Sequence, residues 1–115
     1  MNNNLEFLDS VICKIGSRIA GKIKSSEKSE IDKALGVLSN DGVYAYYVYV
    51  KSKGNDNIFI DEIKELMKYT DTKLENDNCE NYFVNLSSNI NDLLFFKEVL
   101  EETLIYARYH AKARE

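Results

Sequence analysis

Both ends of the chain carry long segments in which apolar residues recur every three or four positions, the spacing of one face of an α-helix. This spacing holds at Leu5, Leu8, Ile12, Ile15, Ile19 and Ile23, and again at Leu93, Phe96, Leu100, Leu104, Ala107 and Ala111. No proline occurs anywhere in the chain. Because proline breaks helices and is common in the turns of β-rich domains, its absence favours a helical protein.

Small residues interrupt the first of these segments at Gly16, Ala20 and Gly21. Glycine lowers the stability of a helix by about 1 kcal/mol relative to alanine, so it needs a compensating reason. We therefore expect the backbone of a second element to approach the first helix closely at this point.

Shorter helical patterns fill the middle of the chain. Ser26 or Ser29 can cap one helix and Asn57 or Asp61 another. The first helix carries the apolar residues Ile31, Ala34, Leu35 and Leu38, and the second has one side formed by Ile60, Ile63, Leu66, Met67 and Thr70. Residues 71–81 predict the longest loop. Residues 82–86 fit a helix or a strand, and Ser87, Ser88 or Asn89 can cap the last helix.

The segment Ser39–Asn57, SNDGVYAYYVYVKSKGNDN, is the most ambiguous part of the sequence. Its tyrosines and valines favour a strand by propensity, and the flanking glycines suit turns. A strand would need a partner, and the only candidates are short. We therefore expect a helix over 43–51, with Asp41 as its N-cap and Gly54 just beyond its end. The alternative is an α+β fold with a small hairpin.

The length of 115 residues suits one domain, which we expect to span 1–115. The predicted fold is all-α, a compact bundle of about five to six helices with a central tyrosine-rich helix. No apolar run is long enough to span a bilayer, and the first residues lack the pattern of a signal peptide. The expected location is therefore the cytoplasm, with no membrane partner.

No group of residues in the sequence assembles a catalytic site. His110 is the sole histidine, and a lone histidine cannot begin a zinc site. Cys13 and Cys79 are expected to be reduced, with Cys13 in the core. Neither a phosphate-binding glycine loop nor a nucleophile elbow occurs. We expect a protein that is not an enzyme, with no metal, cofactor or small-molecule substrate.

Two stripes of cations are the candidate binding residues. Lys14, Arg18 and Lys22 recur every four positions on one face of the first helix. Arg108 and Lys112 are one turn apart in the last helix, where Tyr106, Tyr109 and His110 are interleaved with them, and Lys97 and Arg114 extend the basic set. Cations with aromatic rings between them suit a nucleic-acid backbone with unpaired bases, although the net charge is −4. The alternative is a solvated helix face or an ion pair of Arg108 with Glu101 or Glu102.

The tyrosine-rich helix offers a candidate protein interface at Tyr44, Tyr46 and Tyr49. Tyrosine suits a half-buried protein surface because its ring packs while its hydroxyl stays in water. The same residues also suit a core from which the hydroxyl groups reach the surface.

Two segments resemble the small helical subunit of type III-B (Cmr) CRISPR effector complexes. LSNDGVYAYYVYVKSKG resembles the asparagine–glycine entry and central helix of that family, and DLLFFKEVLEETLIYARYHAKARE resembles its last helix with a basic end. Asp41 splits the asparagine–glycine pair and tyrosine replaces most aliphatic residues. The equivalent small subunit of a Csm-type or type I-A complex is therefore an alternative.

The resemblance implies an all-α, non-catalytic subunit that acts in antiviral defence. Its implied partners are copies of itself, other CRISPR effector subunits, and the backbones of the guide RNA and target RNA. Two other classes remain open from the sequence. NIFIDEIKELMKYT resembles the start of a winged-helix DNA-binding regulator, although an acidic loop follows where a recognition helix is expected. A small protein-interaction module is the third class.

Overall fold

The computed structural model describes the backbone of residues 3–114 and the side chains of residues 7–114. This part of the chain contains six α-helices and two 3₁₀ helices and no strand. The α-helices are α1 (Asn3–Lys22), α2 (Ser29–Asp41), α3 (Val43–Ser52), α4 (Asp56–Phe59), α5 (Cys79–Leu86) and α6 (Ile90–Ala113), and the 3₁₀ helices are η1 (Ser25–Glu27) and η2 (Asp61–Tyr69). The predicted all-α bundle of five to six helices is confirmed.

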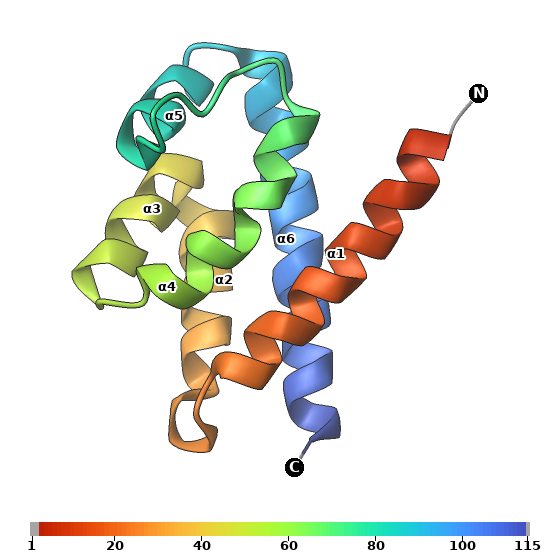
Figure 1. The fold of residues 1–115 in the computed structure, drawn as a ribbon. Helices are drawn as coiled ribbons and strands as arrows, with labels where there is room; N and C mark the ends of the chain where they lie inside the picture. Colours follow the sequence, from red (N-terminus) through yellow and green to blue (C-terminus); the bar gives the residue numbers. More distant parts are fainter. Residues whose placement is uncertain (1–2, 115) are drawn as a thin grey trace.

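The long helix α6 runs through the middle of the bundle (Figure 1). It makes its most extensive contact with α1 and also packs against α2, η2 and α5. The tyrosine-rich helix α3 instead packs against α2, α4 and α5. The central helix of the fold is therefore α6, because it has the longest apolar face, whereas α3 lies to one side.

The contact between α1 and α6 is built on the predicted apolar faces. Leu8, Ile12, Ile15, Ile19 and Ile23 are all buried, while the side chain of Leu5 lies outside the described residues. The two backbones come close at Gly16, because a Cβ atom placed on it would lie 3.0 Å from the amide nitrogen of Ala107. The expected close backbone approach is therefore confirmed at Gly16, whereas Gly21 is exposed.

The ambiguous tyrosine-rich segment is a helix, as predicted for 43–51. Asp41 is the last residue of α2 and not the N-cap of α3, so this detail of the prediction is wrong. The cap residue is Gly42, whose φ of 100° lets the chain turn from α2 directly into α3. The hydroxyl group of the buried Tyr46 donates a hydrogen bond of 2.7 Å to the carbonyl oxygen of Phe59. This bond fixes α3 against α4.

The predicted helix around residues 60–70 is mainly the 3₁₀ helix η2. Residues three apart are aligned along a 3₁₀ helix, and the buried Ile60, Ile63 and Leu66 have this spacing. The same register aligns Glu62 with Glu65 on another side of η2. The apolar residues were thus correctly identified as core, but the three-residue period selects a 3₁₀ helix instead of an α-helix.

The last third of the chain matches the predicted boundaries closely. Residues 82–86 belong to α5, which resolves their ambiguity, and Asn78 caps this helix. Asn89 caps α6 by accepting a hydrogen bond of 3.1 Å from the backbone N–H of Asp92. Asp92 in turn accepts bonds of 2.8 and 2.7 Å from the backbone and hydroxyl of Thr72, so the segment between η2 and α5 is fastened to α6.

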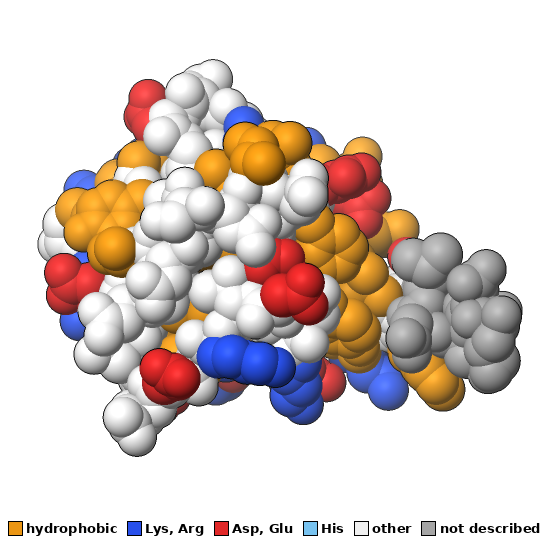
Figure 2. Space-filling view, turned by 90° about the horizontal axis from the view of Figure 1, so that it is seen from above, with side chains coloured by type: hydrophobic (Ala, Val, Ile, Leu, Met, Phe, Trp, Pro, Cys, Tyr) orange, Lys and Arg blue, Asp and Glu red, His pale blue; other side chains and the backbone are white. Residues whose placement is uncertain are grey.

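Helices that could cross a membrane are absent from residues 3–114, because none of them combines the necessary length and hydropathy. Figure 2 shows the end of the molecule that carries α5 and the start of α6. Backbone and uncharged polar side chains cover much of this face, with hydrophobic and charged side chains in separate areas of it.

Candidate nucleic-acid interface

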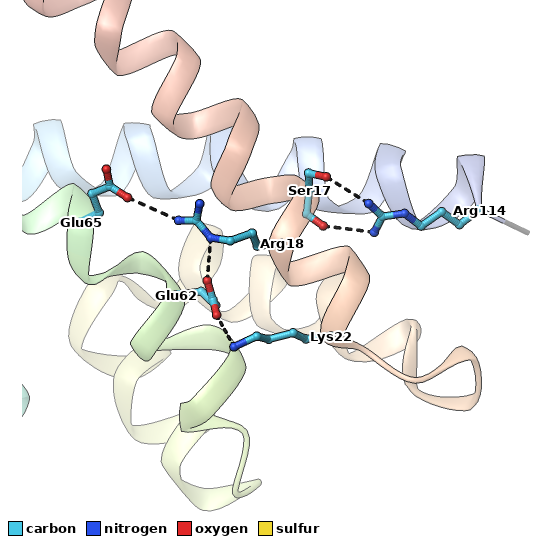
Figure 3. A network of polar contacts seen from close by, with 6 residues as sticks. All are labelled: Ser17, Arg18, Lys22, Glu62, Glu65 and Arg114. Atoms are coloured by element: carbon cyan, nitrogen blue, oxygen red, sulfur yellow. Dashed lines mark hydrogen bonds and ion pairs between the residues drawn. The ribbon is translucent and has the colours of Figure 1, made fainter.

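Two of the three cations in the first stripe are held by carboxylates of η2. The Nε atom of Arg18 donates to Glu62 at 2.9 Å, and the same guanidinium lies 3.3 Å from Glu65. The ammonium of Lys22 forms an ion pair with the second oxygen of Glu62. Figure 3 shows these groups pointing toward one another across the gap between α1 and η2. The predicted stripe therefore joins two elements of the fold.

The electrostatics of Glu62 follow from this arrangement. Its side chain is only 12% exposed. Burial alone would raise the pKa of Glu62, but hydrogen bonds from Lys22 and Arg18 lower this pKa below its usual value. A nucleic-acid phosphate that bound Arg18 and Lys22 would have to displace this carboxylate. All three cations of the stripe are exposed, and Lys14 is the one that makes no ion pair with a described residue.

The second stripe lies beside a small cavity where α2 begins and α6 ends. The cavity has a volume of about 210 Å³, and its basic lining residues are Lys28, Arg108 and Lys112. Arg108 approaches Asp32 of α2 at 3.4 Å, and the side chains of both residues are more than one third exposed. The alternative pairing of Arg108 with Glu101 or Glu102 is not present. The long distance and the exposure make this a weak ion pair.

Aromatic side chains accompany the second stripe. Tyr109, which follows Arg108, is 60% exposed, and Tyr106 is 43% exposed. Exposed rings next to cations can stack on unpaired bases while the cations contact phosphates. Aromatic rings and cations are therefore both accessible to solvent near the end of α6.

The remaining basic residues of α6 tie this helix to its neighbours. Arg114 donates to the carbonyl oxygen and the hydroxyl group of Ser17 at 3.1 and 3.0 Å. Lys97 lies 3.5 Å from the carbonyl oxygen of Ser39. Both are therefore less available to an anionic partner than Lys112, which is exposed and has no ion pair within the described part of the chain.

The predicted tyrosine interface is only partly available. Tyr46 has no exposed surface, so its assignment to an interface is wrong. Its inward position follows from the period of α3, which aligns it with the core residues Val43 and Val50. Tyr44 is 40% exposed and remains open to a partner. Tyr49 is half-buried, and its hydroxyl lies 3.3 Å from a carboxylate oxygen of Glu30.

Residues with catalytic or metal-binding potential do not gather in the structure. Cys13 is exposed on α1, which corrects the expectation that it lies in the core. Its position on the helix falls beside the apolar stripe and not within it. Burial raises the pKa of Cys79, so its thiol is held in the unreactive form. Among residues 7–114, no group of three or more histidine, cysteine or acidic side chains could hold a metal ion.

Searches of known protein families, of curated proteins and of solved structures found no match to this chain. The function must therefore be inferred from the all-α bundle and its two sets of cations. Carboxylates largely neutralise the cations of α1, whereas the cations of α6 border a cavity near exposed tyrosines.

Proposed function

We propose that the protein is a non-catalytic, RNA-binding small subunit of a CRISPR-type RNA-guided effector complex. The cation set at the end of α6 carries this proposal. Arg108 and Lys112 border the cavity of about 210 Å³, and the ring of Tyr109, which lies between them in the sequence, is exposed. The all-α bundle and the resemblance of two segments to the Cmr small subunit are in line with this role.

The two stripes differ in what an RNA backbone would have to displace. Arg18 and Lys22 share the carboxylates of Glu62 and Glu65, and Glu62 is nearly buried. Arg108 has one exposed partner, Asp32, at 3.4 Å, and Lys112 is exposed. Carboxylates of the protein therefore compete less with an RNA phosphate for Arg108 and Lys112 on α6 than for Arg18 and Lys22 on α1. Arginine can also make forked phosphate contacts and stack on a base, which makes Arg108 the main contact residue in this proposal.

The winged-helix alternative lacks support in the described part of the chain. A wing is a β-hairpin, and residues 3–114 contain no strand. The segment after η2, where a recognition helix would follow, is an irregular connection to α5.

Self-association and docking with other effector subunits form the second part of the proposal. Tyr44 and Val48 lie one turn apart on α3 and are 40% and 47% exposed. Helix α3, which carries this exposed pair, lies on the side of the molecule away from the α1–α6 contact (Figure 1). With Tyr46 buried, Tyr44 is the tyrosine of α3 best placed to meet a neighbouring subunit.

The experiment for RNA binding is a double charge reversal, Arg108→Glu with Lys112→Glu, measured against single-stranded RNA at two salt concentrations. The net charge of −4 predicts weak binding by the wild-type chain alone. We expect the double variant to bind at least about ten-fold more weakly at low salt. The loss of two phosphate contacts should also reduce the slope of log affinity against log salt by about 1.4.

A matched control carries the same change of charge in α1 and in the turn that follows it, Lys14→Glu with Lys24→Glu. Both control residues are exposed and lie outside the α6 cavity. Helical circular dichroism checks that each variant is folded. Unchanged affinity and salt slope in the α6 variant would contradict the proposal. Loss of binding in the control pair alone would assign the contact to α1 instead.

A further inference from the structure

We propose that a second cavity, between η2 and the segment that follows it, binds a small organic anion with an aliphatic body. This cavity has a volume of about 600 Å³, within the usual range for small-ligand sites. Its cationic lining residues are Lys64, Lys68 and Lys73, and its apolar lining comes from Met67 and Leu74. The site is separate from the α6 cavity and does not depend on the proposed RNA contact.

The walls of this cavity are held in place by buried hydrogen bonds. The chain leaves η2 at Thr70, whose hydroxyl lies 2.9 Å from the carbonyl of Met67, 3.1 Å from that of Thr72 and 2.8 Å from the hydroxyl of Tyr82. Thr72 donates two further bonds to Asp92 of α6. The residues that lead into Lys73 and Leu74 are thus tied to α5 and α6. A site whose walls are already ordered loses little entropy when a ligand binds.

The charge of the lining favours an anion. Lys64 lies 3.2 Å from Asp61 and 2.9 Å from Asp77, so it is already paired. Lys68 and Lys73 are exposed, and neither pairs with a carboxylate within residues 7–114. The single acidic residue of the lining, Glu65, is engaged with Arg18 at 3.3 Å. An anionic group near Lys68 and Lys73 would therefore meet two uncompensated cations on a chain whose overall charge is negative.

The uncharged part of the lining indicates that the body of the ligand is aliphatic. Met67 is almost fully buried and Leu74 is half-buried against the core, so together they form an apolar floor. The stems of the lysines add further apolar surface. No aromatic side chain lines the cavity, and the threonine hydroxyls are already bonded. A nucleobase would find neither an aromatic stacking partner nor a free hydroxyl group for its edge, whereas an aliphatic chain requires neither.

The experiment uses the side chain of Met67 as a local probe. The chain has two methionines, Met1 and Met67, so the methyl resonance of Met67 is easy to assign in protein labelled at the methionine methyl group. The labelled protein is titrated at low ionic strength with octanoate, with octan-1-ol and with inorganic phosphate. We expect a saturable shift of the Met67 resonance with octanoate and at least ten-fold weaker responses to the other two compounds. An equal response to octanol or to phosphate would overturn the proposal.

The charge requirement is tested with Lys68→Glu combined with Lys73→Glu. We expect this variant to bind octanoate at least ten-fold more weakly, because both uncompensated cations are replaced by anions. The control is again Lys14→Glu with Lys24→Glu, which should bind within two-fold of wild type. If the reversal disturbs the fold, the single variants Lys68→Ala and Lys73→Ala replace it, since both side chains are exposed. Unchanged octanoate affinity in the folded variants would contradict the assignment.

Discussion

Gly16 of α1 lies against the backbone of α6 so closely that a Cβ atom on it would be 3.0 Å from the Ala107 nitrogen. The same atom would lie 2.9 Å from the Cβ of Tyr106 and 3.1 Å from the carbonyl oxygen of Thr103. Two of these three neighbours are backbone atoms, which cannot move aside without a shift of the whole helix. The absence of a side chain at position 16 therefore sets the distance between the two longest helices.

The first prediction is that Gly16→Ala destabilises the protein. Overpacking costs about 1–3 kcal/mol, which exceeds the gain of about 1 kcal/mol in helix propensity. Urea denaturation followed by circular dichroism measures the change. The matched control is Gly36→Ala in the middle of α2, where nothing lies within 4 Å of the new atom. We expect this control to be stabilised by about 0.5–1 kcal/mol. A Gly16→Ala variant as stable as the control would show that the α1–α6 contact is looser than described.

The second prediction concerns Glu62 and acid stability. Its folded-state pKa lies below the ordinary value of 4.5, so the ionised carboxylate stabilises the folded state. This contribution is fully present above the unfolded-state pKa and is lost as the pH falls through the folded-state pKa. Glu62→Gln should therefore lower the free energy of unfolding by about 1 kcal/mol at pH 7 and flatten its dependence on pH below 4.5.

The control for Glu62 is Glu65→Gln. The side chain of Glu65 is 41% exposed and, among residues 7–114, forms an ion pair only with Arg18, so we expect a loss below about 0.5 kcal/mol. Denaturant titrations at several pH values between 3 and 7 compare the three proteins. An equal effect of the two substitutions, or an unchanged pH profile for Glu62→Gln, would argue against a structural role for the α1 cations.

The sequence predicts the elements of this fold better than the pairings between them. Apolar periodicity identifies α1 and α6, because a helix needs one continuous face to pack against a core. The glycine at position 16 predicts the close approach for the same local reason. In contrast, Arg18 and Glu62 are 44 positions apart, and Arg108 and Asp32 are 76 apart. Nothing in the local pattern of either stripe distinguishes a cation that meets a carboxylate from one that faces water.

The tyrosine-rich segment shows a second limit of prediction from the sequence. Strand propensity and helical period disagree over residues 43–50, and the structure follows the period because α2 and α5 supply apolar partners. Tyr47 stacks on Phe83 of α5 with ring centroids 4.9 Å apart. Tyr46 points inward on the face of α3 that carries Val43 and Val50, and its hydroxyl group bonds to Phe59 of α4. Side-chain type alone therefore does not separate the interface candidate Tyr44 from the core residue Tyr46.

The third prediction follows from the weak pairing of Arg108 with Asp32. If Arg108 contacts RNA phosphate, Asp32 competes with the RNA for the guanidinium group. Asp32→Asn should then strengthen binding to single-stranded RNA by up to about five-fold at low salt, since an exposed ion pair is worth about 0.2–1 kcal/mol. Because Asp32 lies in the first turn of α2, the same change should also reduce stability by about 0.3–1 kcal/mol.

The control for this prediction is Glu98→Gln, which removes one negative charge from an exposed position of α6. Glu98 precedes Arg108 by ten residues, a separation of about 15 Å along the helix. A general charge effect would strengthen RNA binding equally in both variants, whereas release of Arg108 strengthens it only in Asp32→Asn.

A second control combines Asp32→Asn with Arg108→Ala. If Asp32 acts by holding Arg108, the gain from Asp32→Asn disappears once the guanidinium is absent. If Asp32→Asn still increases RNA affinity in the absence of Arg108, Asp32 does not act through the proposed Arg108–phosphate contact.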